Sequence, residues 1–386
     1  MNQSAVIVDC VRTPVGRAHR DRGYFRDVRS DDLAVACVKA LLERTGIAPT
    51  EIEDVVLGCT QQTLEQGLNV ARNVALMAGL PIESGATTVN RLCGSSLQAL
   101  HQATHAIQAG AENVHIVGGL EHMHHLPLDF NFDINPKLYQ RTSKGAMMMG
   151  VTAEFLAQMH DISRADQDRF ALASHQKAAA AQAKGEFARE IVPVYGRDES
   201  GSRALLDRDQ CVRADASLEA LAALEPAFMP KVGTVTAGNS SPLNDGSAAL
   251  LVMSEDKAKS LGLKPLVRIR ATAIAGVEPC VMGTGPVPAT NKALRRAGLQ
   301  LSDIDLIELN EAFASQALAC VRLLEIDEAK VNVRGGAIAI GHPLGASGAR
   351  LSATLINTML DRQATLGLAT MCIGGGQGIA TIFERV

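Results

Sequence analysis

The stretch LLERTGI at residues 41–47 recurs as ALRRAGL at residues 293–299, and an apolar, strand-like run follows each copy. Gly46 and Gly298 are 298 − 46 = 252 positions apart. Two further pairs of blocks lie in the same order. RLCGSS at 91–96 matches HPLGAS at 342–347, an offset of 342 − 91 = 251, and IVGG at 116–119 matches CIGG at 372–375, an offset of 372 − 116 = 256. Such a repeat predicts two similar subdomains in one chain.

Each copy of the repeat reads as helix, strand, glycine-rich turn, helix and strand, which predicts α/β subdomains with parallel-type strands packed against helices. Apolar and small side chains at Leu97, Leu100, Thr104 and Ile107 share one helical face, and Gly110 occupies the position of a C-terminal cap. The repeat disappears in the middle of the chain. We therefore expect an N-terminal subdomain at 1–120 and 242–265, an inserted loop domain at 121–241, and a C-terminal subdomain at 266–386.

Composition narrows the class of protein. The 386 residues are 47% apolar and 20% charged, with a formal net charge of −4, which fits a soluble α/β protein and argues against a nucleic-acid-binding function. No apolar run is long enough to predict a membrane span. Eight scattered cysteines without a C-x-x-C pair suggest reduced thiols, so we expect a cytoplasmic location.

Cys93 is the first candidate catalytic residue. It follows the strand-like run at 87–90 and precedes a predicted helix that opens at Gly94. A thiol at a helix N-terminus is exposed to free backbone N–H groups, which lower the pKa and favour a reactive thiolate. A buried structural cysteine is the alternative interpretation of this position.

His342 lies in the turn GHPLGASG at 341–348, and the repeat aligns it two residues from the position of Cys93. Pseudo-symmetry would bring the two side chains face to face as a Cys–His pair, the usual means of activating a thiol nucleophile. His101, His105 and His175 are expected to be structural. Because the spacing of GLEHMHH at 119–125 matches no standard zinc motif, we expect no metal site there.

Cys372 precedes the glycines of GGGQG at 374–378. Only eight residues follow Gly378, too few for the helix and strand of a dinucleotide-binding unit. The remaining interpretation is a bare-backbone turn whose N–H groups can stabilise an oxyanion. Asn310, in NEAF at 310–313, ends a predicted strand and is either a functional amide or the cap of the next helix.

Six motifs together resemble the thiolase family: RTPVGR at 12–17, NRLCGS at 90–95, TVTAGN at 234–239, NEAF at 310–313, GHP at 341–343 and CIG at 372–374. The resemblance implies a thiolase-like fold with a layered α-β-α-β-α core. It also implies an acyltransferase that uses coenzyme A as co-substrate and holds no tightly bound cofactor. Residues 63–67, 118–123 and 378–386 are similar to the degradative 3-ketoacyl-CoA thiolases that form the β-subunit of bacterial fatty-acid-oxidation complexes.

The resemblance implies a role for each residue that stands at a matching motif position. Cys93 would take the acyl group, His342 would deprotonate Cys93 and later the CoA thiol, and Cys372 would exchange the proton at the α-carbon. Asn310 would hold a water that forms one oxyanion site with His342, and the N–H groups of Cys93 and Gly374 would form the other. For CoA itself, the resemblance indicates Ser241, Arg213, Phe228 and Met148.

The same resemblance implies a homodimer or a dimer of dimers, and a multifunctional hydratase/3-hydroxyacyl-CoA dehydrogenase subunit as a further partner. The function predicted is thiolytic cleavage of 3-ketoacyl-CoA in fatty acid β-oxidation. A biosynthetic acetoacetyl-CoA thiolase, a β-ketoadipyl-CoA thiolase, a ketoacyl synthase and a non-catalytic lipid carrier are the alternatives. Cys372 argues against the synthase, which would have histidine there.

Overall fold

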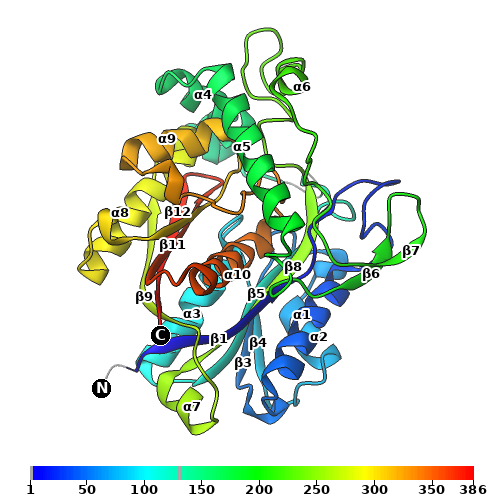
Figure 1. Ribbon diagram of the computed structural model, residues 1–386, viewed down its shortest axis with the longest axis vertical. Coiled ribbons are helices and arrows are strands. Elements are labelled where there is room, and N and C mark those ends of the chain that lie inside the picture. The colour runs from blue at the N-terminus through cyan, green and yellow to red at the C-terminus, as the bar shows by residue number, and fades with distance from the viewer. Residues whose placement is uncertain (1–2, 129, 131–132) are drawn as a thin grey trace.

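A computed structural model describes residues 3–128, 130 and 133–386. One twisted sheet runs through the molecule in the order β4-β3-β5-β8-β1-β9-β12-β11-β10 (Figure 1). Its N-terminal half contains β1 (Ala5–Arg12), β3 (Asp54–Gly58), β4 (Gly85–Val89), β5 (Val114–His122) and β8 (Asn244–Ser254), with the short β2 (Gly16–Arg17) beside β8. Its C-terminal half contains β9 (Val267–Gly276), β10 (Leu306–Leu309), β11 (Leu366–Ile373) and β12 (Gln377–Arg385).

The repeat is visible in how the strands pair. In the first half β3 is parallel to β5, β5 is antiparallel to β8, and β8 is antiparallel to β1. In the second half β10 is parallel to β11, β11 is antiparallel to β12, and β12 is antiparallel to β9. The expectation of parallel strands was therefore only partly right. Because the three residues 374–376 alone join β11 to β12, that pair can only be antiparallel.

Helices cover both faces of each half-sheet. The central layer is α3 (Ser95–Ala109) with α10 (Leu344–Arg362), which pack against each other and against strands of both halves. α1 (Ser30–Thr45) and α2 (Val70–Met77) cover the outer face of the first half, and α8 (Pro286–Ala297) and α9 (Ala314–Leu324) that of the second. α7 (Glu255–Ser260) follows β8. The five layers confirm the predicted thiolase-like fold class.

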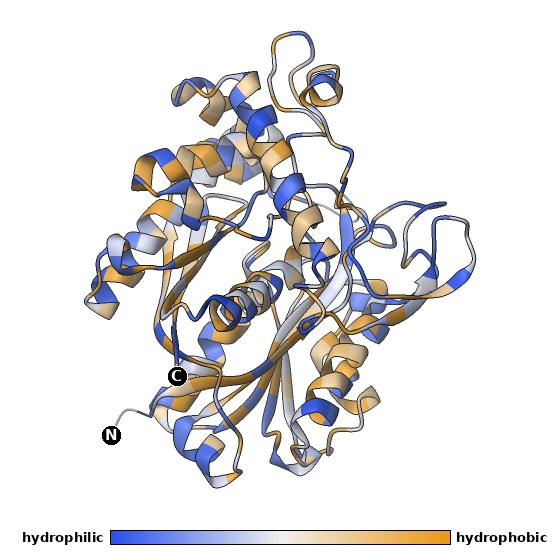
Figure 2. Ribbon diagram, in the orientation of Figure 1, coloured by the Kyte–Doolittle hydropathy of each residue, from blue (hydrophilic) through white to orange (hydrophobic). Residues whose placement is uncertain are grey.

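Strand periodicity explains this layering. Along β8, Leu250 and Val252 join the core beneath α3 and α10, whereas Leu251 and Met253 join the core beneath α1 and α2. Alternate side chains point to opposite faces of a strand, so a strand covered on both faces is apolar throughout. Figure 2 shows this in the strands of both halves. Every residue of α10 from Leu344 to Met359 is buried, as expected of a helix between two sheets.

The central segment contributes α4 (Met149–Met159), α5 (Arg164–Ala183), α6 (Leu218–Ala222) and the hairpin of β6 (Val194–Arg197) and β7 (Arg203–Leu206). Arg12, at the end of β1, is fully buried and joins this segment to the sheet. Its Nε lies 2.7 Å from Glu190 Oε1, and its Nη1 and Nη2 lie 2.7 and 2.9 Å from Asp209. The boundaries proposed for the three domains stay a prediction. No helix in the described residues is long and apolar enough to cross a bilayer.

Glu121, near the end of β5, connects the two halves. Its buried carboxylate accepts hydrogen bonds from the amide and hydroxyl of Thr60 at 3.0 and 2.7 Å, from the Gln61 amide at 3.2 Å and from Gln66 Nε2 at 2.9 Å. A fifth donor is the amide of Gly345, at 2.9 Å, in the first turn of α10. The carboxylate therefore joins the loop after β3 to the start of the central helix.

We predict that Glu121→Gln destabilises the fold by about 2–4 kcal/mol, because the new NH2 group must face donors at one of the two oxygen positions. Chemical denaturation followed by circular dichroism measures the change. The matched control is Glu43→Gln on the exposed side of α1, which should change the free energy of unfolding by less than about 0.5 kcal/mol. Equal effects of the two substitutions would contradict a connecting role for Glu121.

Candidate active site

Cys93 lies in the turn between β4 and α3, directly after a strained residue. Leu92 has a φ of 46°, which is unfavourable for a branched side chain. Ser95 holds the turn: its Oγ donates to Leu92 O at 2.6 Å and accepts from the Arg91 amide at 2.9 Å. Burial raises the pKa of Cys93 to about 11, although hydrogen bonds from the N–H groups of Gly374 and Cys93 itself lower it. The N–H groups at this turn do lower the pKa, as the sequence predicts, but burial outweighs them, so the thiol requires the base that a Cys–His pair would supply.

Cys372 and Gly374 lie against the Cys93 turn. A Cβ on Gly94 would be only 2.6 Å from Cδ1 of Ile373, so the side chain of Ile373 packs directly on the backbone of this turn. Burial raises the pKa of Cys372 well above its usual range, and Cys93 raises it further. The structure thus brings together three of the predicted residues: two thiols and the Gly374 N–H.

His342 directly precedes α10, and three contacts fix its position. Its amide donates to Asn244 Oδ1 at 2.8 Å, Nδ1 lies 2.6 Å from Ser347 Oγ, and Nε2 lies 3.3 Å from Nδ2 of Asn310. Gly341 enters this turn with a φ of 121°, where a Cβ would meet the side chain of Asn244. Burial lowers the pKa of His342 to about 3, and the charge of Arg350 adds to this effect. The ring is therefore neutral, as a base must be.

Asn310 follows β10, and its backbone N–H donates a hydrogen bond to the carbonyl oxygen of Thr370 at 3.0 Å. Phe313, and not Asn310, precedes the first residue of α9, so the capping interpretation of Asn310 is wrong. Its Oδ1 is buried without a hydrogen-bond partner among the described residues. A buried polar atom of this kind usually binds an ordered water. Asn310 and His342 together therefore offer a polar site for a water or an oxyanion.

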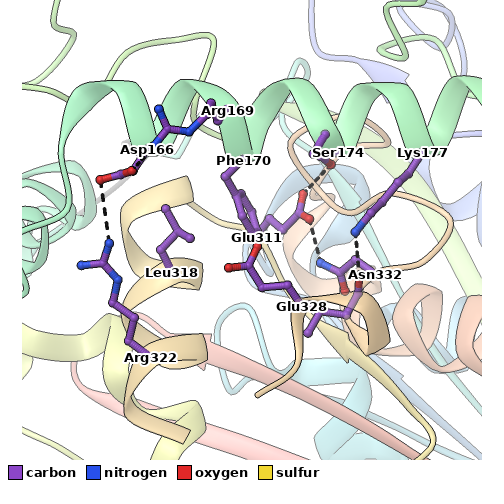
Figure 3. Close-up of a pocket in the computed structure, with 12 residues that line it drawn as sticks. Asp166, Arg169, Phe170, Ser174, Lys177, Glu311, Leu318, Arg322, Glu328 and Asn332 are labelled. Atoms are coloured by element: carbon purple, nitrogen blue, oxygen red, sulfur yellow. Dashed lines mark hydrogen bonds and ion pairs between the residues drawn. The ribbon is translucent and has the colours of Figure 1, made fainter. Parts of the chain in front are cut away.

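Glu311 points away from this centre. Its carboxylate accepts hydrogen bonds from Ser174 Oγ and Asn332 Nδ2, both at 2.7 Å. Figure 3 shows it at a cavity of about 360 Å³ between α5 and α9. Asn332 also bonds to both backbone groups of Leu309, at 2.9 and 2.8 Å. Glu311 therefore supports the strand end on which Asn310 is placed.

The four predicted CoA-binding residues differ in their surroundings. Phe228 packs edge-on against Phe313, with ring centroids 5.8 Å apart, and Ser241 bonds to Ala312 O, so both lie beside the NEAF motif. Arg213 is exposed. Met148 is 53% exposed, whereas Met149 lies against the catalytic segment, its sulfur 3.7 Å from where a Cβ of Gly374 would be.

Sequence reasoning missed the residues that orient His342. Ser347 and Asn244 both hydrogen-bond to it, and neither was among the candidates. For Ser347 a signal existed, because the repeat aligns Ser347 with Ser96 and both are serine. For Asn244 no local pattern was available, since the contact spans 98 positions.

The histidines of the 119–125 segment form a separate cluster. The rings of His122 and His125 stack with centroids 3.7 Å apart and planes 14° apart, and each Nε2 faces a backbone carbonyl, of Phe25 and Arg26 respectively. Glu65 lies 3.1 Å from His125 Nδ1 and raises the pKa of His125. One ligand atom each of Glu65, His122 and His125 lies within 4.8 Å of the others, although His122 Nδ1 already accepts a hydrogen bond from the His125 amide at 3.1 Å. The expectation of no metal site stays a prediction.

Comparisons with known proteins agree with this geometry. Models of the thiolase N-terminal and C-terminal domains match residues 5–256 and 263–385. The chain is 56% identical over 388 residues to a 3-ketoacyl-CoA thiolase of Aeromonas salmonicida, covering 100% of both chains. Human mitochondrial 3-ketoacyl-CoA thiolase is 38% identical with a TM-score of 0.92, covering 100% of this chain and 99% of the human one.

An acetyl-CoA acetyltransferase of Bacillus anthracis is 39% identical with a TM-score of 0.91, covering 100% of both chains. The family models together span nearly the whole sequence, and the full-length relatives share the same fold. The family predicted from the six motifs is confirmed: the chain belongs to the thiolase family.

Proposed function

We propose that this protein is a 3-ketoacyl-CoA thiolase, which cleaves a 3-ketoacyl-CoA with free CoA to acetyl-CoA and an acyl-CoA shorter by two carbons. The single observation that best supports it is the contact of Cys93 with the Cys372–Gly374 segment, where the Gly374 N–H hydrogen-bonds to the Cys93 thiol. His342, neutral and held by three contacts, lies just before α10, the helix that packs against α3. Two thiols serve two tasks. One attacks a carbonyl carbon as a nucleophile, and the other transfers a proton at carbon.

In the first half-reaction His342 takes the proton of Cys93, and the sulfur attacks the 3-keto carbon. The bond between C2 and C3 then breaks, the acyl group stays on Cys93, and Cys372 donates its proton to the carbon that leaves as acetyl-CoA. The imidazolium of His342 then returns its proton to the Cys372 thiolate, which restores the neutral base. In the second half-reaction His342 takes the proton of the CoA thiol, the CoA sulfur attacks the acyl-Cys93 thioester, and the leaving Cys93 sulfur takes that proton back from His342, so atoms and protons balance.

The pKa values support this order of events. Because Cys93 is protonated and His342 is neutral at physiological pH, the resting site holds no charge pair. Charge appears only when substrate is bound, as an imidazolium on His342 and a tetrahedral oxyanion on the substrate. The Gly374 and Cys93 N–H groups, and Asn310 with His342 through a water, are proposed to stabilise the oxyanion.

The degradative substrate class is favoured over the biosynthetic one. Full-length relatives named 3-ketoacyl-CoA thiolase from two Aeromonas species are 56% identical, whereas the acetyl-CoA acetyltransferase of Bacillus anthracis, at 39%, is as distant as the human 3-ketoacyl-CoA thiolase, at 38%. We propose CoA as co-substrate without a tightly bound cofactor. Phe228, Ser241 and Met148 are proposed to bind it along the pantetheine arm and the tunnel. Two observations support this: Phe228 and Ser241 lie beside Phe313 and Ala312, and Met149, next to Met148, lies beside Gly374. Arg213 is proposed to bind the nucleotide end.

We predict thiolysis across a 3-ketoacyl-CoA series from four to sixteen carbons, with ping-pong kinetics. Cys93→Ala and His342→Ala should each lower kcat by at least about 10³-fold, since they remove the nucleophile and its base. Loss of the 3-ketoacyl-CoA absorbance measures the rate. Activity confined to acetoacetyl-CoA would indicate the biosynthetic class, and no activity at any length would overturn the proposal.

Ser347→Ala should lower kcat by about 10-fold to 100-fold while KM changes little, because His342 loses the group that fixes its ring orientation. Ser352→Ala, one turn and a half further along α10, is the matched control, since its Oγ bonds only to Gly348 O at 2.8 Å. Steady-state kinetics on both variants give the comparison. A Ser347→Ala enzyme with wild-type kcat would contradict the orienting role.

A homodimer is proposed as the working unit. β4 is one of the two edge strands of the sheet in the described residues, and in the segments that precede it the side chains of Leu68 and Ile82 are 91% and 74% exposed. An unpaired strand edge with exposed apolar side chains favours pairing with a second copy. A dimer of dimers, and association with a hydratase/3-hydroxyacyl-CoA dehydrogenase subunit, are proposed on the likeness to 3-ketoacyl-CoA thiolases alone. The cytoplasm is the proposed location, since all eight cysteines are free.

Sedimentation velocity should give a dimer or a tetramer for the chain alone, because closing the β4 edge buries Leu68 and Ile82. Leu68→Glu together with Ile82→Glu should shift the population towards monomer. A monomeric wild-type chain at micromolar concentration would contradict the dimer. Adding the hydratase/dehydrogenase subunit and finding no faster-sedimenting species would contradict the larger complex.

A further inference from the structure

Arg91 stands in the turn of Cys93, at the position that the repeat aligns with His342. Its backbone is part of this turn. The Arg91 N–H donates to Ser95 Oγ at 2.9 Å, and its carbonyl oxygen accepts a hydrogen bond from the Gly94 N–H at 3.0 Å. A force that holds the Arg91 side chain therefore also holds the turn that contains the proposed nucleophile.

The half-buried guanidinium of Arg91 leads from this turn to the other half of the fold. Its Nε donates to Gln98 Oε1 on α3 at 2.7 Å, and its Nη1 donates to Gln377 Oε1 at 2.8 Å. Gln377 is the first residue of β12 and pairs with Ile373 of β11 across the turn at 374–376. One guanidinium therefore bridges the two halves of the fold, between residues 286 positions apart.

The bridge lies beside the contacts that acyl transfer requires. The Gly374 N–H hydrogen-bonds to the Cys93 thiol, and the side chain of Ile373 packs on the backbone at Gly94. Hydrogen bonds weaken steeply when the angle at the hydrogen falls below about 120°. A small displacement of one turn against the other would therefore deprive an oxyanion of its donor, and the bridge opposes that displacement.

The same side of α3 makes two further polar contacts with the C-terminal half. His101 Nε2 lies 2.9 Å from Thr381 Oγ1 of β12, and His105 Nε2 lies 3.0 Å from Thr272 Oγ1 of β9. Gln98, His101 and His105 are three and four residues apart, which places them on one side of the helix. His105 lies 105 − 95 = 10 residues, about 15 Å, beyond the first residue of α3. Its contact joins the halves far from the chemistry.

The proposed reaction divides unequally between the halves. Cys372, Asn310 and His342 all lie in the C-terminal half, whereas Cys93 comes from the N-terminal half. Exchange of an α-proton of acetyl-CoA uses only the groups of the C-terminal half. Transfer of an acyl group between CoA molecules uses Cys93 together with an N–H donor of the other half. The second process therefore depends on how the halves are held together, and the first does not.

We propose that Arg91 is a positioning residue for acyl transfer: with Gln98 and Gln377 it holds the turn of the nucleophile against the 374–376 turn, which begins with the oxyanion donor. This inference rests on the proposed thiolase function, with Cys93 as the nucleophile. Arginine suits this place because its planar fork directs N–H groups at two acceptors at once. Loss of the fork should slow the process that crosses between the halves and spare the one that does not.

The test measures three rates: thiolysis of 3-ketooctanoyl-CoA, exchange of labelled CoA into hexanoyl-CoA, and exchange of deuterium from D2O into the methyl group of acetyl-CoA. Cys93→Ala is the blank for CoA exchange, and Cys372→Ala is the blank for deuterium exchange. In Arg91→Met, CoA exchange and the kcat of thiolysis should fall about 10-fold to 100-fold, because a displaced donor no longer stabilises the oxyanion. Deuterium exchange should stay within about threefold of the wild-type rate.

Variants of Gln377 test whether the contact itself is responsible. Gln377→Met removes the same hydrogen bond from the other side, so it should slow CoA exchange and spare deuterium exchange in the same way. Arg91→Met/Gln377→Met should be no slower than Arg91→Met, because a shared contact is lost only once. If Arg91→Met does not fold, Gln377→Met, which leaves the bond between Arg91 and Gln98 in place, gives the same comparison of the two exchange rates.

Thr272→Val is the matched control. It removes the hydroxyl beside His105 and so breaks a polar contact between the same helix and the same half of the fold, far from the site. Valine has nearly the shape of threonine, so packing should be retained. All three rates should stay within about twofold of the wild-type rates.

CoA exchange at the wild-type rate in Arg91→Met, or in Gln377→Met, would overturn the inference. An equal fall of deuterium exchange and CoA exchange would also overturn it, as would an equal slowing by Thr272→Val, because either result would indicate a general loosening of the fold. A wild-type protein inactive on every 3-ketoacyl-CoA would instead overturn the proposed function. The two proposals therefore fail by different observations.

Discussion

The five hydrogen bonds to the carboxylate of Glu121 are the constraint on which the arrangement of the site depends. They join the loop after β3 to the first turn of α10, and so fix the segment that contains His342 relative to the half of the fold that contains Cys93. β5 and α10 approach each other so closely here that no side chain fits between their backbones. A Cβ on Gly119 would be 2.1 Å from the carbonyl oxygen of Gly345. Strand and helix thus meet backbone to backbone, and a small shift of either would displace the base.

A second layer of buried polar contacts fixes the loop of Asn310. The carboxylate of Glu154 accepts hydrogen bonds from the amides of Thr234 and Val235, and Asn239 bonds to Asp168 Oδ1 at 3.0 Å. The end of the 234–239 segment lies beside the 310–313 motif. The backbone N–H of Ala314, the residue after that motif, donates to Asn239 O at 2.9 Å. TVTAGN at 234–239 is therefore a scaffold for the site, although the chemistry takes place on other motifs. Rigid support of this kind is what precise catalytic geometry requires.

The main elements could be predicted from the sequence, because the repeat and the helical periodicity are local patterns. α3 starts and ends where the face of Leu97, Leu100 and Ile107 and the cap at Gly110 predict. The antiparallel return of β12 was missed because strand periodicity gives no direction, which here is set by the short link between β11 and β12. The burial that raises the pKa of Cys93 could not be read locally, because it depends on which segments meet in space. The roles of the site residues, with Met148 among those for CoA, stay predictions.

The pseudo-symmetry of the chain explains why its two halves can share one reaction. Cys93 and His342 each stand two residues before the first residue of a central helix. The two helices meet near those ends, where the Ala349 amide donates to Ser96 Oγ at 2.9 Å and a Cβ on Gly348 would be 2.6 Å from the Leu97 amide nitrogen. A repeated fold thus offers the same kind of turn on both sides of one contact. The repeat aligns His342 with Arg91 rather than with Cys93, so the proposed base and nucleophile occupy neighbouring positions of two equivalent turns. The third pair of repeat blocks, at 116–119 and 372–375, also differs between the halves. Of these two blocks only the second has a cysteine, Cys372, before its glycines.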